Sequence, residues 1–145
     1  MKTRQKHLYD TLRTGDVIRI GKSLYTLEVA DTFMSRFWGL MGRKNLPSGR
    51  ALLIKPCNSI HTFFMRFRMT AVFVDKNMRV VKVVPNMAPW RMTFAPKAYC
   101  VFELAGDEGE ETKEGDDLSE VFHRIKKEPP SEEKGLAPVP PPVAN

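Results

Sequence analysis

The sequence is poor in the features that mark secreted and membrane-spanning proteins. It has two cysteines, Cys57 and Cys100, too few for a disulfide framework. No apolar run reaches the roughly 18 residues that a transmembrane helix needs, and no apolar stretch of a secretory signal follows the basic first residues. These absences predict a cytoplasmic chain with reduced, buried thiols, and a structural disulfide between the two cysteines is the alternative.

Histidine is also scarce, which limits metal and thiol chemistry. Cys57 and His61 are four residues apart and are candidate metal ligands, with Cys100 as the third candidate. The other histidines, His7 and His123, lie in peripheral segments. Zinc sites use three or four such ligands, usually in closely spaced pairs. The sequence therefore predicts no metal site and no cofactor. Cys57 and His61 would share one face of a strand as nucleophile and base, but no third group that orients the base is evident.

Charge is distributed unevenly along the chain. The whole sequence has 23 basic and 17 acidic residues and a net charge of +6. Residues 1–102 hold 18 basic and 5 acidic residues, a net charge of +13, whereas residues 103–145 hold 5 and 12, a net charge of −7. This asymmetry favours an acidic partner, which is nucleic acid, an anionic surface or the chain's own acidic segment. A solvated basic surface with an acidic tail for solubility explains it equally simply.

Short alternating segments separated by turn residues predict a mainly β domain. Strands are expected over residues 16–20, 24–30, 51–55, 60–66, 71–74, 78–84 and 99–104. Turns at residues 21–23 and 75–77 join two hairpins, and Asn77 is expected to take the positive φ of the second turn. Residues 85–97 contain three prolines and are expected to form a long loop. This pattern predicts a small two-sheet sandwich or barrel-like domain with one or two short α-helices.

Two segments have helical spacing. Phe33, Phe37 and Met41 recur every four residues, which predicts a helix that begins after Asp31 and ends at a left-handed Gly42. Residues 118–125 also have helical spacing, and an edge strand over residues 118–122 is the competing interpretation.

Polar segments flank the predicted domain. Residues 1–14 lack periodicity and are expected to form a loose arm, and residues 15–127 a single compact domain, as a monomer. Residues 128–145 are rich in Pro and Glu. That composition cannot bury enough apolar surface to offset the entropy of ordering, so a disordered tail is expected there.

Two motifs carry a resemblance to a known family. The runs from Arg36 to Pro47 and from Cys57 to Phe67 resemble the signatures of the prokaryotic family called domain of unknown function 192, and later landmarks extend the match to about residues 24–118. The resemblance implies a compact, mainly β domain similar to a two-sheet sandwich, and it implies no activity. The family tends to have Pro, an aliphatic residue and Asp after the second motif, where this chain has Arg68, Met69 and Thr70. A carboxylate that would balance nearby arginines is therefore missing.

Arginines are the strongest candidates for ligand binding. The candidates are Arg36, Arg43, Arg66 and Arg68. The first two are two helical turns apart and project from one face of the predicted helix, and the other two share a face of the next segment. Guanidinium groups bind carboxylates and phosphates through a planar fork. The sequence therefore predicts a non-catalytic binding or accessory module with an Arg-lined basic groove for an acidic small molecule or protein. The alternative role for Arg36 is an ion pair with Asp75 or Glu103.

Single-stranded nucleic-acid binding is the second predicted function. Three aromatic residues, Phe64, Phe67 and Trp90, are interleaved with Arg66, Arg68 and Arg91 in the basic part of the chain. No recognised nucleic-acid-binding fingerprint accompanies them, and Trp38 and Trp90 are expected to pack in the core or at its rim. A thiol-dependent enzyme that uses Cys57 and His61 ranks third.

Overall fold

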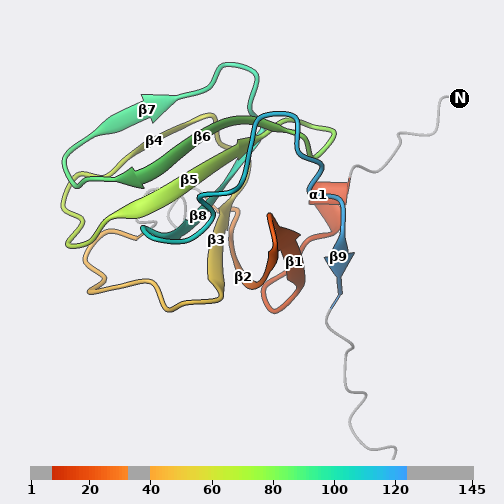
Figure 1. Cartoon of the computed structure of the whole chain (residues 1–145), viewed down its shortest axis with the longest axis horizontal. Coiled ribbons are helices and arrows are strands. Elements are labelled where there is room, and N and C mark those ends of the chain that lie inside the picture. Colours follow the sequence, from red (N-terminus) through yellow and green to blue (C-terminus); the bar gives the residue numbers. More distant parts are fainter. Residues whose placement is uncertain (1–7, 33–39, 124–145) are drawn as a thin grey trace, which may run out of the picture.

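Two β-sheets and one short helix make up the computed structural model, which describes residues 8–32 and 40–123 (Figure 1). The elements in chain order are α1 (Leu8–Thr11), β1 (Val17–Ile20), β2 (Ser23–Ala30), β3 (Arg50–Ile54), β4 (Ser59–His61), β5 (Met69–Val74), β6 (Val80–Met87), β7 (Met92–Phe94), β8 (Cys100–Ala105) and β9 (Val121–Phe122). The mainly β, two-sheet prediction is confirmed, and the sheets do not close into a barrel.

The larger sheet has seven strands in the order β6-β5-β8-β3-β2-β1-β9. Its neighbours pair antiparallel except for β2 and β3, which run parallel. The smaller sheet consists of β4 and β7 alone, paired antiparallel. Strands β6 and β9 form opposite edges of the large sheet, and the small sheet lies on the β6 side, far from β9 (Figure 1).

The core occupies both faces of the large sheet. Strand β5 alternates between them: Val72 and Val74 join one buried cluster, and Ala71 and Phe73 join the other. The helix α1 contributes to the first cluster, and the small sheet and residues 40–46 contribute to the second. Because both faces are covered, β5 is apolar along nearly its whole length instead of alternating with polar residues.

The N-terminal segment departs from the predicted loose arm. Residues 8–11 form α1, and the side chains of Tyr9 and Leu12 are buried in the first core cluster. A helix of four residues is too short to show a 3.6-residue repeat, so the sequence pattern gave no sign of it. Among the described residues, no helix is long and apolar enough to span a membrane.

Several boundaries also differ from the sequence predictions. The loop expected over residues 85–97 contains the end of β6 and the whole of β7. The positive φ expected at Asn77 occurs at Met78, with a φ of 61°. Residues 121–122 form the edge strand β9 on β1, so the edge strand expected over residues 118–122 is present only at its end, and a helix does not form in the described part of this segment. The predicted helix after Asp31 falls largely on residues 33–39, outside the described residues, but Gly42 has the expected positive φ of 76°.

Candidate functional site

The outer surface of the small sheet carries unusually exposed apolar side chains. In the β4–β7 register, His61 pairs with Met92 and Ser59 with Phe94, so these four side chains share one side, while Ile60 points to the core. The exposed fractions of Met92 and Phe94 are 71% and 65%. We call this surface the aromatic face; its members are His61, Phe63, Phe64, Trp90, Met92 and Phe94.

Ring contacts join the loop after β4 to the loop before β7. The Phe64 and Trp90 ring centroids are 4.8 Å apart, and the Phe63 ring lies 6.0 Å from Trp90 and 4.9 Å from His61. Phe64 and Trp90 nevertheless remain 65% and 57% exposed. Trp90 therefore packs on neighbouring rings while one side stays in solvent, which partly meets the expectation of rim packing.

Thr62 fixes the relative position of the two loops. Its hydroxyl donates to the Ala88 carbonyl at 2.7 Å and accepts from the Arg91 amide at 2.9 Å. Its carbonyl accepts from the Trp90 amide at 3.0 Å. The side chain is fully buried, so these bonds are shielded from water. Thr62 therefore holds Trp90 beside the β4 loop.

The backbone of the aromatic face is strained at two bulky residues. Phe64 has a φ of 64° and Trp90 a φ of 65°, in the left-handed region that large side chains rarely adopt. Such conformations persist only where surrounding contacts enforce them, and they concentrate at ligand sites. Here the Thr62 hydrogen bonds and the contacts between rings supply that enforcement.

A groove of about 900 Å³ lies at one end of the aromatic face. It is lined by Met41, Gly42, residues 61 and 63–66, and Trp90. Its volume falls in the range of small-molecule sites, and its lining is apolar apart from Arg66 and His61. The groove thus offers a ligand an apolar surface and one exposed guanidinium group.

Formal charges in the sequence around the aromatic face are positive except for that of Asp75. Residues 56–74 and 76–102 contain no acidic residue. Arg66, Arg68, Lys82, Arg91 and Lys97 are the basic side chains considered for this face, because Lys76 lies over the Tyr99 ring and Arg79 donates to the Gly115 carbonyl. Lys82 Nζ lies 6.0 Å from the Phe94 ring centroid and donates to the Phe94 carbonyl at 3.0 Å. One cation therefore sits directly against the exposed end of the small sheet.

The four arginines predicted from the sequence do not share one environment. Arg66 lines the groove, and Arg68 donates to the Asn86 carbonyl at 3.1 Å. Arg43 forms a two-pronged ion pair with Glu28, with Nη1 at 2.9 Å from Oε2. Arg36 lies outside the described residues. Ligand binding by these arginines stays a prediction, and Arg43 would have to give up Glu28 to take part.

Cys57 and His61 have separate partners. The Cys57 thiol donates to the Ser59 carbonyl at 3.0 Å, whereas His61 Nδ1 accepts from the Phe63 amide at 3.3 Å and its ring stacks on Phe63. No disulfide joins Cys57 to Cys100, and burial raises the pKa of the Cys100 thiol to about 12. Within residues 8–32 and 40–123, no group of three or more His, Cys, Asp or Glu side chains is placed to hold a metal ion.

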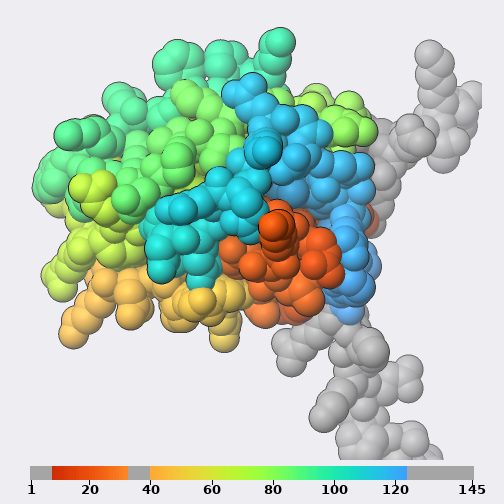
Figure 2. Space-filling model, in the orientation of Figure 1, coloured from red at the N-terminus to blue at the C-terminus, as the bar shows by residue number. Residues whose placement is uncertain are grey.

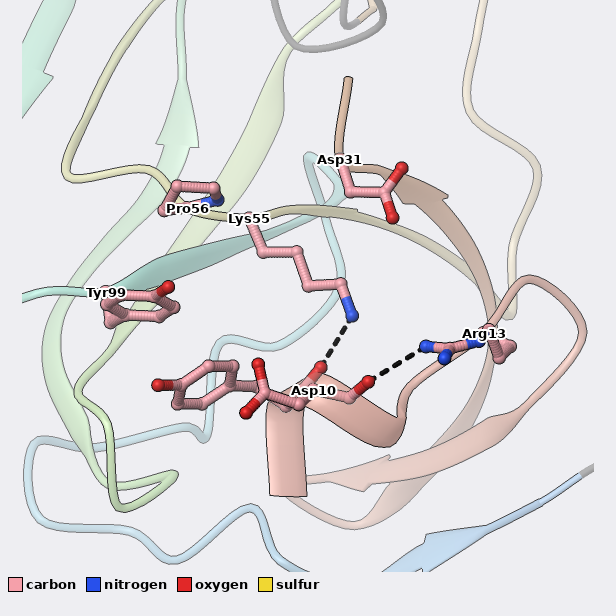
Figure 3. A pocket seen from close by; sticks show the side chains of 7 residues that line it. Asp10, Arg13, Asp31, Lys55, Pro56 and Tyr99 are labelled. Atoms are coloured by element: carbon pink, nitrogen blue, oxygen red, sulfur yellow. Dashed lines mark hydrogen bonds between the residues drawn. The ribbon is translucent and has the colours of Figure 1, made fainter. Parts of the chain in front are cut away.

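A polar cavity of about 510 Å³ beside α1 was not expected from the sequence (Figure 3). Lys55 extends into it and is 8% exposed, and its Nζ donates to the Tyr9 and Leu12 carbonyls at 2.6 and 3.1 Å. Burial lowers the pKa of Lys55, with Arg13 acting in the same direction and Asp31 against it. Carbonyls at a helix C-terminus lack partners within the helix. Lys55 therefore fastens α1 to the sheet, a structural role.

A second buried ionisable group lies beneath the Glu28–Arg43 pair. Leu52 pairs with Glu28 on one side and with Glu103 on the other, so both carboxylates lie on the same side of the sheet. Glu103 is 4% exposed and its Oε2 atom has no hydrogen-bond partner in the described structure. Burial raises its pKa to about 8, and Arg43 opposes this only in part. Within the described structure, burial therefore favours the protonated form of Glu103.

Part of the aromatic face was not evident from the sequence. Met92 and Phe94 lie between Pro89 and Pro96 in the segment interpreted as a loop, although their alternation with Thr93 is the pattern of a short strand. Phe67, which the sequence grouped with Phe64 and Trp90 as a nucleic-acid-binding aromatic residue, packs partly buried against the second core cluster.

Comparison with known proteins gives one family and several relatives. The model of the family DUF192, described as Uncharacterized ACR, matches residues 16–119. A UPF0127 protein of Pyrococcus horikoshii is 36% identical over 88 residues, which cover 57% of this chain and 73% of the relative.

Two solved structures share the fold. A protein of unknown function from Novosphingobium aromaticivorans gives a TM-score of 0.63 at 20% identity, over 71% of this chain and 81% of the other. A Sinorhizobium meliloti protein, provisionally described as a transcription regulator, gives 0.62 at 16% identity, over 71% and 89%. At these identities the likeness establishes the fold alone.

Proposed function

The chain belongs to the DUF192 family, whose description names no activity, and we propose that it is a binding module that holds an acidic ligand on the aromatic face. One observation carries the proposal: exposed rings cluster on a surface whose flanking sequence, residues 56–102, contains seven basic residues and a single acid, Asp75. Contiguous exposed apolar patches on soluble proteins commonly mark interaction sites. Positive charge around the patch selects for an anionic partner.

The groove and its rim have complementary roles in this proposal. Phe63, Phe64 and Trp90 supply apolar area for a flat or apolar part of the ligand. Arg66, inside the groove, supplies a charge-assisted hydrogen bond to a carboxylate, sulfonate or phosphate. Arg68 and Arg91 lie in the same two loops and add to the positive potential. Arg43 is left out because Glu28 already neutralises it.

An anionic aromatic dye provides a direct test. We expect anilinonaphthalene sulfonate to bind the folded protein more tightly than its uncharged analogue, N-phenylnaphthylamine, because only the sulfonate can pair with Arg66. One charge-assisted hydrogen bond contributes about 1.5–3 kcal/mol, so Arg66→Gln should weaken dye binding by about tenfold. Dye fluorescence during titration measures both affinities.

Two matched substitutions control for general effects on the surface. Phe122→Ser removes an exposed ring from β9, at the opposite edge of the large sheet, and Arg79→Gln removes an exposed arginine outside the groove. Neither should change dye affinity. Trp90→Asn, which removes a ring of the groove, should weaken dye binding. The proposal fails if the neutral dye binds as tightly as the anionic one, or if Phe122→Ser weakens binding as much as Trp90→Asn.

A further inference from the structure

Resting on the proposed function, we infer that the acidic ligand is single-stranded nucleic acid, with bases stacked on the aromatic face and phosphates paired with its flanking cations. The inference stands on the repeated placement of an exposed ring beside a basic side chain. A nucleotide strand repeats the complementary pair, a flat base and an anionic phosphate.

The first ring and cation lie at the small-sheet end of the face. Phe94 is 65% exposed, with Lys82 Nζ 6.0 Å from its ring centroid. A base stacked on the free side of Phe94 would place its phosphate within reach of this ammonium group. A base stacked on an aromatic ring contributes about 1–3 kcal/mol without regard to base identity.

The second group of rings and cations lies at the end of the aromatic face that holds the groove. Trp90 and Phe64 form a ring pair with centroids 4.8 Å apart, and both rings remain more than half exposed. Arg91 follows Trp90 directly in the chain, and Arg66 lines the groove beside Phe64. Met92, on β7 between the two ends, provides a 71% exposed apolar surface that links them.

The geometry favours a single strand over a duplex. Rings that project from the surface of a β-sheet reach bases only where the bases are unpaired, and several RNA-binding domains present aromatic side chains from a sheet in this way. A duplex would offer this surface phosphates alone, and the rings would then gain nothing. An acidic peptide would match the charge, but it lacks a ring at every repeat.

Fluorescence anisotropy with labelled oligonucleotides of about 12 nucleotides, within the usual site size, tests the inference. The probes are oligo(dT), an abasic strand with the same number of phosphates, and a duplex of equal length. We expect oligo(dT) to bind at least about tenfold more tightly than the abasic strand, since two stacked bases suffice for that ratio. The duplex should bind no better than the abasic strand.

Substitutions separate stacking from charge. Trp90→Asn removes the ring and introduces a residue that tolerates the φ of 65°. This variant should lose most of the preference for oligo(dT) over the abasic strand. The salt dependence of its binding should stay unchanged. Arg66→Gln combined with Arg91→Gln should weaken both strands and lower the slope of log affinity against log salt by about 0.7 for each lost contact. Phe122→Ser and Arg79→Gln serve as the controls, and near-UV circular dichroism verifies folding.

Several outcomes would overturn the inference. Equal affinity for oligo(dT) and the abasic strand, or for oligo(dT) and the duplex, would show that the rings do not stack on bases. Tighter binding to a glutamate–tyrosine copolymer or to anionic phosphatidylglycerol vesicles than to oligo(dT) would assign another partner. If the protein binds no oligonucleotide at low salt but still binds the anionic dye through Arg66, this inference fails and the proposed function stands.

Discussion

Replacing Glu103 with Gln should make the protein more stable at neutral pH and remove much of the loss of stability that occurs between about pH 5 and pH 8. Glu103 is buried on the side of β8 that faces the second core cluster, and Oε2 lacks a hydrogen-bond partner among the described residues. Burial raises its pKa from 4.5 to about 8. Gln has the same shape and no charge, so Glu103→Gln keeps the packing and removes the titration.

The sign follows from the numbers of bound protons. Between pH 4.5 and about 8 the folded protein holds a proton on Glu103 that the unfolded chain has lost. The free energy of unfolding therefore falls by about 1.4 kcal/mol for each pH unit, and the stability is fully present only below the unfolded pKa. From pH 5 to pH 7 the free energy of unfolding therefore falls by about 3 kcal/mol. This is an upper limit, because entry of water and rearrangement of nearby groups lower the cost of ionising a buried carboxyl group.

Urea denaturation at a series of pH values from 5 to 8 provides the assay. Wild type and Glu103→Gln should have similar free energies of unfolding near pH 5 and diverge by about 3 kcal/mol at pH 7, with the variant more stable. All other ionisable groups are the same in both proteins, so the difference between the two curves isolates Glu103. Parallel curves would refute the reasoning, because they would mean that Glu103 is ionised in the folded protein.

Glu28→Gln is the matched control, since Arg43 lowers the pKa of Glu28. This group contributes stability above its unfolded pKa that is lost as pH falls, so Glu28→Gln should destabilise the protein at pH 7. The pair is partly exposed, so the effect should stay below about 1 kcal/mol. If Glu28→Gln lowers the free energy of unfolding at pH 7 and Glu103→Gln raises it, the predicted direction of both pKa shifts is verified.

Three further substitutions test the positions that support the site. Thr62→Val should cost about 1–3 kcal/mol, because the Ala88 carbonyl and the Arg91 amide lose a buried partner; it should also increase quenching of tryptophan fluorescence by acrylamide. Gly106→Ala should destabilise strongly in a thermal melt, because an added Cβ would lie 2.8 Å from the Arg68 carbonyl oxygen; an unchanged melting temperature would contradict the packing. Lys55→Met should increase proteolysis within residues 8–14, because α1 loses its bonds to Lys55; unchanged cleavage would show that burial of Tyr9 and Leu12 suffices.

The parts of the fold that follow from local pattern were predictable. The hairpin of β1 and β2 alternates clearly and turns at Gly21, and the pairing matches the prediction. Strand β7 escaped prediction because prolines on either side are typical of loops, and they outweighed the short alternation of Met92, Thr93 and Phe94. No sequence pattern indicates that Glu103 is buried, since glutamate is seldom buried without a partner.

The candidate site depended on pairings that sequence spacing does not reveal. Arg36 and Arg43 stood out because helical spacing places them on one face, yet Arg43 lies on Glu28 through contacts of the tertiary structure. The contact between Phe64 and Trp90 spans 26 residues, and hydrogen bonds of Thr62 hold the two loops together. Composition did indicate the relevant chemistry, since aromatic and basic residues interleave there without acids.

The placement of the acidic residues strengthens the case for an acidic partner. Residues 107–117 carry seven acids and one lysine, and hydrogen bonds hold this segment against the N-terminal half of the chain: Glu111 accepts from the Lys22 amide and Glu108 from the Gly49 amide. In Figure 2 the cyan segment lies against the red hairpin of β1 and β2, and the green residues that lead into β7 occupy the upper part of the molecule. These bonds keep the acidic segment on the hairpin and not on the aromatic face. An approaching anion is thus repelled at one end of the molecule and attracted at the other, so the field orients it before contact. Neutralising acids in residues 107–117 weakens the repulsion at that end and raises the net positive charge, so it should raise the association rate of oligo(dT) at low salt and leave its dissociation rate unchanged.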